Sequence, residues 1–129
     1  MDGVNSKTVL AEHFKGRRII IRQLEWSYGV PGITTHYENY YCGYVELFPE
    51  DYYYHHLSEA EACLAIHGGI TWTPEYGRLD ELPADGTFIG FDTARTKYTF
   101  KLQALAADCQ SLIDQIIKRN EENAHGNKD

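Results

Sequence analysis

Residues 102–117 read LQALAADCQSLIDQII, and this segment sets the architecture expected of the whole chain. Apolar and small residues recur in it at the three- and four-residue spacing of one helix face. They are Leu102, Leu105, Ala106, Cys109, Leu112, Ile113, Ile116 and Ile117, with Lys101, Gln103, Asp108, Asp114 and Lys118 opposite. This pattern predicts a long amphipathic helix that packs its apolar stripe on a sheet. The heptad-like spacing also leaves open a two-helix interface between subunits.

Four runs upstream have the composition of the strands that such a helix would cover. Residues 18–26 are β-branched at their centre, and residues 36–48 are rich in Tyr on both faces of an extended chain. Residues 70–73 and 87–92 are shorter runs joined by the polar loop at residues 74–86, and we expect them to pair antiparallel.

Residues 58–64 between these runs are predicted to form a short helix, with Ser58 as N-cap and Glu61 completing the capping box. The predicted fold class is therefore α+β: a mostly antiparallel sheet of about four strands, a short helix and a long C-terminal amphipathic helix. The length of 129 residues suits one domain. We expect a flexible lead-in at residues 1–15, a single α+β domain at 16–120 and a disordered tail at 121–129.

The charge balance limits the classes of partner. Twelve Lys and Arg against 19 Asp and Glu give a net charge of −7, which argues against general nucleic-acid binding. It fits a soluble acidic protein or one that meets a basic partner surface. The odd set of Cys42, Cys63 and Cys109 has no metal-ligand spacing, and we expect reduced thiols, a cytoplasmic location and no membrane segment.

The residues most suited to chemistry are His67-Gly68-Gly69 and Asp92. Two glycines leave the backbone free to take positive φ, so that N–H groups can approach a ligand or an oxyanion; a simple tight turn is the plainer interpretation. Asp92 ends an apolar run, where a carboxylate can orient an imidazole, hold a metal, bind a ribose hydroxyl or cap the next turn. With Trp72 and Arg95 these residues form the predicted ligand-binding site, for an anionic or nucleotide-like molecule.

Signals for a metal or a cofactor are weak. His55 and His56 point to opposite faces if they lie on a strand, so we predict no metal site there and no cofactor. The Walker, GxGxxG, HExxH and GxSxG motifs are all missing from the sequence.

Three segments together resemble a family of small phage and prophage proteins of unsettled function. They are Tyr41-Cys42-Gly43-Tyr44-Val45, His67-Gly68-Gly69-Ile70-Thr71-Trp72 and Phe88-Ile89-Gly90-Phe91-Asp92-Thr93-Ala94. The resemblance extends from Tyr41 to Lys118 and implies a C-terminal helix. Members usually carry a histidine where this chain has Arg95. Because Arg stays protonated and cannot coordinate a metal, the change favours binding an anion over turning over a substrate.

The resulting hypothesis is a non-enzymatic counter-defence protein in the bacterial host cell. It would inhibit host immunity by binding an immune protein, as anti-CRISPR proteins do, or by sequestering a nucleotide-like signal. One alternative is a small hydrolase or metal-dependent enzyme that uses His67 and Asp92. Another is a protein–protein adaptor. We also expect a homodimer, formed through the C-terminal helix or the Tyr-rich strand.

Overall fold

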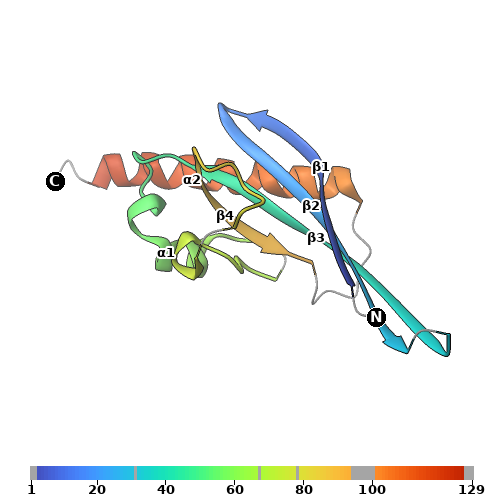
Figure 1. Ribbon diagram of the computed structural model, residues 1–129. Helices are drawn as coiled ribbons and strands as arrows, with labels where there is room; N and C mark the ends of the chain where they lie inside the picture. The colour runs from blue at the N-terminus through green and yellow to red at the C-terminus, as the bar shows by residue number, and fades with distance from the viewer. Residues whose placement is uncertain (1–2, 31, 67, 78, 94–100, 127–129) are drawn as a thin grey trace.

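The protein folds as a four-stranded antiparallel sheet with one long helix against it (Figure 1). The computed structural model describes residues 3–30, 32–66, 68–77, 79–93 and 101–126. The elements are β1 (Gly3–Phe14), β2 (Arg17–Val30), β3 (Thr34–Leu47), η1 (Tyr53–His55), α1 (Leu57–Cys63), η2 (Pro74–Tyr76), β4 (Thr87–Asp92) and α2 (Leu102–Gly126). The strands lie in the order β1-β2-β3-β4. The predicted α+β class, the last strand and the start of the C-terminal helix are confirmed.

The predicted flexible lead-in at residues 1–15 is wrong for the part described, because Gly3–Phe14 forms β1 and pairs with β2. The pairing register shifts between Thr8 and Leu10, which marks a β-bulge. Val9 and Leu10 both pack against the core under the helix, so the period of two breaks in mid-strand. The β1–β2 hairpin turns at Lys15 and Gly16. Both residues have positive φ, as a two-residue type I′ turn requires.

The predicted strand at residues 70–73 is also wrong, since only an isolated antiparallel bridge joins Trp72 to Gly90. The antiparallel direction was predicted correctly, but β1 supplies the remaining strand of the sheet. Pro74 follows at once and has no N–H for a ladder, while the Thr73 hydroxyl accepts a hydrogen bond from the Glu75 N–H. This local bond starts η2 instead of continuing a strand.

α1 lies one residue earlier than the predicted 58–64 at both ends, and α2 differs from prediction at its C-terminal end. His56 is the N-cap of α1, which begins at Leu57 with no side-chain cap bond, so the capping box of Ser58 and Glu61 is wrong. The predicted disordered tail is wrong up to Gly126, where α2 ends; residues 127–129 lie outside the described residues. Strong helix formers such as Glu121 simply extend a helix that is already nucleated.

The two faces of the sheet are covered by different parts of the chain. On one face α2 packs its predicted stripe on the larger core, of which Ile19, Ile21, Val45, Leu47, Ile89, Phe91, Leu105, Cys109, Leu112, Ile113 and Ile116 are buried members. Five of the eight stripe residues are thus buried within the chain, and Leu102, Ala106 and Ile117 are partly buried against the same core; a two-helix interface stays a prediction. On the other face the segment after α1 covers a smaller cluster: Ile20, Cys42, Tyr44, Leu82 and Phe88, with Trp72 and Leu79 against it. Within the described residues, no helix has the length and apolarity to cross a bilayer.

Candidate functional site

A cavity of about 420 Å³ opens on the face of the sheet opposite α2. Its described lining residues are Trp72, Pro74, Gly77, Leu79, Leu82, Pro83, Ala84, Gly86, Thr87 and Phe88. The loop between η2 and β4 and the first residues of β4 supply most of these lining residues. The volume lies within the range of roughly 300–1,000 Å³ typical of small-molecule sites.

Trp72 lines the cavity and is held in place by the backbone of β4. The N–H groups of Thr71 and Trp72 donate to the Gly90 carbonyl, and the Gly90 N–H donates to the Trp72 carbonyl over 2.9 Å. The Tyr44 ring lies edge-on to the Trp72 ring, with 6.0 Å between centroids. A Cβ on Gly90 would lie 2.5 Å from that Tyr ring, so glycine is needed for the approach.

The cation beside the cavity is neutralised. Arg18 donates to Glu46 over 2.9 Å and to Asp85 over 2.9 Å, and its guanidinium lies 5.4 Å from the centre of the Phe88 ring. These hydrogen bonds raise the pKa of Arg18. Burial raises the pKa of Glu46, but the bonds from Arg18 outweigh it and leave that pKa below its ordinary value. Among these three described side chains, the two carboxylates outnumber the one guanidinium.

Two titratable groups of the smaller cluster, Cys42 and Tyr44, are held in their neutral forms. Burial raises the pKa of the Cys42 thiol to about 11, against a smaller opposing effect of its hydrogen bond with Tyr44. Burial also raises the pKa of the Tyr44 hydroxyl. At neutral pH neither group is ionised, and a protonated thiol is a poor nucleophile.

The structure brings three of the predicted site residues together along β4. Gly68 and Gly69 take φ values of 76° and 75°. They lie in a turn in which the Gly69 N–H donates a hydrogen bond to the Ile66 carbonyl. A Cβ on Gly68 would lie 3.8 Å from the carbonyl oxygen of Asp92. Trp72 forms its bridge with Gly90, which lies two residues before Asp92 on β4.

Asp92 is the last residue of β4 and pairs with Cys42, on the face that carries Trp72. Of the predicted site residues, Trp72 lines the cavity, whereas Gly68, Gly69 and Asp92 are not among its described lining residues. His67 and Arg95 lie outside the described residues, and their part in the site stays a prediction.

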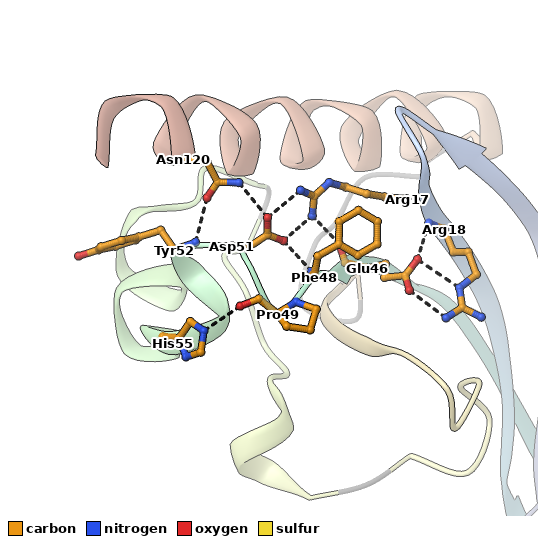
Figure 2. A network of polar contacts seen from close by, with 9 residues as sticks. All are labelled: Arg17, Arg18, Glu46, Phe48, Pro49, Asp51, Tyr52, His55 and Asn120. Atoms are coloured by element: carbon orange, nitrogen blue, oxygen red, sulfur yellow. Dashed lines mark hydrogen bonds and ion pairs between the residues drawn. The ribbon is translucent and has the colours of Figure 1, made fainter. Parts of the chain in front are cut away.

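The two adjacent histidines make separate local contacts. Nε2 of the His55 ring forms a hydrogen bond with the Pro49 carbonyl over 2.8 Å (Figure 2). The His56 ring stacks on the Tyr52 ring, with 4.1 Å between their centroids. In the parts of the chain that the structure describes, no three His, Cys, Asp or Glu side chains group as a metal site would require.

The sequence reasoning missed the apolar residues of the cavity loop. Residues 74–86 have the composition of a polar loop, yet Leu79 and Leu82 turn inward onto the cluster with Phe88. The available signal was the spacing of two leucines within a charged loop, since an apolar residue in such a loop commonly covers a core.

Comparison with protein-family models, with curated proteins and with solved structures finds no match to this chain.

Proposed function

We propose that this chain acts by binding without chemical turnover, as a phage-type counter-defence protein that holds a group of a host immune protein in the cavity beside Trp72. The observation that carries the proposal is the combination at one place of several apolar side chains and an arginine that already has two carboxylate partners. Such a cavity favours an uncharged group over an anion.

The chemistry of the walls indicates the kind of group. Trp72, Leu79, Leu82 and Phe88 offer apolar surface, and an aromatic or aliphatic side chain seated in a pocket is the usual centre of a protein interface. Because Arg18 is bound by two carboxylates, it offers little attraction to a phosphate.

The charge around the cavity suits a basic partner surface. Asp80 and Glu81 are exposed between the two cavity leucines, and Asp85 is exposed at the rim. With a net charge of −7, these carboxylates would accelerate encounter with a basic protein and make the binding rate sensitive to salt. Surfaces that bind nucleic acid are basic, so an acidic protein is suited to block them.

The absence of turnover is supported by the raised pKa values of Cys42 and Tyr44, which leave no ionised nucleophile among these two groups at the site. The counter-defence context comes from the resemblance of the three sequence segments to small phage proteins.

The test is phage plating on bacteria that carry a panel of defence systems, with and without co-expression of this protein. Ala84 is an exposed residue of the cavity, so Ala84→Phe would fill it from the rim without removing core contacts. We expect wild type to restore plating against at least one system and Ala84→Phe to abolish the effect.

The matched control is Ala107→Phe, the same change at an exposed position of α2. It should behave as wild type. Full activity of Ala84→Phe would refute the cavity as the binding site and favour the adaptor alternative. Failure of wild type against every system would refute the counter-defence function.

A second candidate is sequestration of a nucleotide-like signal, favoured by the place of Gly68 next to Asp92 and Trp72. A bare backbone at positive φ, a carboxylate for ribose hydroxyls and an indole for a base would then form the site. Mass spectrometry of the heat-released ligand separates the cases. An intact nucleotide supports sequestration, whereas a cleaved one supports the hydrolase alternative with His67 and Asp92.

A further inference from the structure

β1 lies at one edge of the sheet and is 12 residues long. It pairs with β2 along one side, and among the described residues no strand pairs with its outer side (Figure 1). An edge of this length presents a row of backbone N–H and C=O groups that can template another strand. The pattern of side chains along β1 decides which strand can pair with this edge.

The bulge gives β1 an unusual pattern of faces. Ser6 and Thr8 lie on the face opposite α2, where the Arg22 guanidinium donates to their hydroxyls over 2.7 and 2.6 Å. Beyond the bulge the even-numbered residues change face: Leu10 packs against the core under α2. Two neighbours, Val9 and Leu10, therefore share one face, and an ordinary strand cannot match this pattern.

We propose that the outer edge of β1 binds the β1 edge of a second copy of this chain, antiparallel, in the register that sets Val9 opposite Leu10. In this register Thr8 faces Ala11, and both side chains lie opposite α2, since Ala11 pairs with Ile20 of β2 and Thr8 with Arg22. The two bulges meet at the twofold axis. A shift of one or two residues in either direction brings side chains of opposite faces together at the bulge.

The same register balances the charges of the edge. Lys7 and Glu12 lie on the α2 face, and the twofold axis sets each opposite the other in the partner copy, so the interface gains two cross-strand ion pairs. Within one chain their cross-strand partners are uncharged, Gln23 for Lys7 and Ile19 for Glu12. An unrelated peptide would have to match both charges and the bulge, whereas a second copy matches them by symmetry.

The experiment is light scattering and analytical ultracentrifugation of the whole chain in low salt. Wild type at tens of micromolar should have twice the chain mass of 14.8 kDa. Lys7→Glu and Glu12→Lys each place like charges opposite one another at two symmetry-related positions, and each should weaken dimerisation at least about tenfold. The double variant Lys7→Glu/Glu12→Lys restores opposite charges and should recover the wild-type affinity.

Lys118→Glu is the matched control, the same charge change at an exposed position of α2, and should dimerise as wild type. Circular dichroism confirms that each variant is folded. A wild-type monomer would overturn the proposal, and so would a double variant as weak as the single ones. Because the readout needs no partner, failure here leaves the proposed function untouched, and failure of the plating assay leaves this dimer untouched.

Discussion

Arg17 and Arg18 are neighbours on β2, yet their guanidinium groups lie on opposite faces of the sheet and in different surroundings (Figure 2). Arg17 is 6% exposed and pairs with Asp51, which is 2% exposed and also accepts from Asn120 of α2 over 2.8 Å. Arg18 is 25% exposed, and one of its two carboxylate partners, Asp85, is 81% exposed.

The two arginines differ in how deeply their carboxylate partners are buried, and this difference should affect stability. On the α2 face, Asp51 connects β2, the backbone at Phe48 and α2 through buried hydrogen bonds. Loss of either Arg17 or Asp51 would leave the other charge buried without its partner, which is costly. On the cavity face only the Asp85 partner of Arg18 is solvated, so that carboxylate can move at little cost, while Glu46 is held at 11% exposure. We therefore expect a larger loss of stability when the Asp51 network is broken than when the Asp85 contact is removed.

Asp51→Ala should have the largest effect on stability. It leaves the Arg17 guanidinium buried and unpaired, and the expected loss is about 3 to 5 kcal/mol in the free energy of unfolding. Urea denaturation followed by circular dichroism measures it. Asp85→Ala removes the solvated partner of Arg18 and should leave the urea midpoint almost unchanged. Equal losses in the two variants would contradict the division between the faces.

The pH dependence gives a second test of the same contrast. Burial raises the pKa of Asp51, but hydrogen bonds from Arg17, the Phe48 N–H and Asn120 together hold it below its ordinary value. A carboxyl with a depressed folded pKa contributes stability above its unfolded pKa, which is about 3.9, and loses it as the pH falls through the folded value. The gap in stability between wild type and Asp51→Ala should therefore narrow below about pH 4.

Truncating a leucine on each face should give the next largest difference. Leu112 of α2 is fully buried in the larger core, and Leu112→Ala should cost about 2 to 5 kcal/mol in unfolding free energy. Leu79 is only partly buried at the cavity, and Leu79→Ala should cost about 1 kcal/mol or less. Thermal and urea unfolding measure both. A Leu79→Ala loss as large as that of Leu112→Ala would mean that the cavity wall is rigid core.

The sequence predicted the parts of the fold that follow a regular period. The stripe on α2 and the run at Thr87–Asp92 repeat without interruption, so local pattern was enough to place them. β1 was missed because its bulge at Val9 breaks the alternation and its turn uses Lys15 where Asn or Asp would be recognised.

The site could be predicted only in part, for a related reason. The glycines before Ile70 and the strand end at Asp92 are recognisable by residue type. The cavity beside Trp72 depends instead on where the loop folds back, and that is decided by contacts between Leu79, Leu82 and residues far away in sequence. Such long-range packing leaves no periodic pattern in the sequence.

Lys15→Asn should have the smallest effect, because two weak terms of opposite sign meet in the β1–β2 turn. Lys15 takes a φ of 52°, which Asn tolerates better than Lys, and relief of this strain should stabilise the fold by up to about 1 kcal/mol. The change also removes the ion pair between Lys15 and Asp114, in which both side chains are about half exposed, and such a pair contributes about 0.2 to 1 kcal/mol.

Salt separates these two terms. Added salt screens the ion pair of the wild type and leaves the backbone strain as it is, so the stabilisation by Lys15→Asn should grow as the ionic strength rises. Urea midpoints at low and high salt measure the change, and Asp114→Asn is the control that removes the ion pair alone. A destabilising effect of Lys15→Asn that persists at high salt would contradict this account, because a screened ion pair cannot produce it and relief of the backbone strain has the opposite sign.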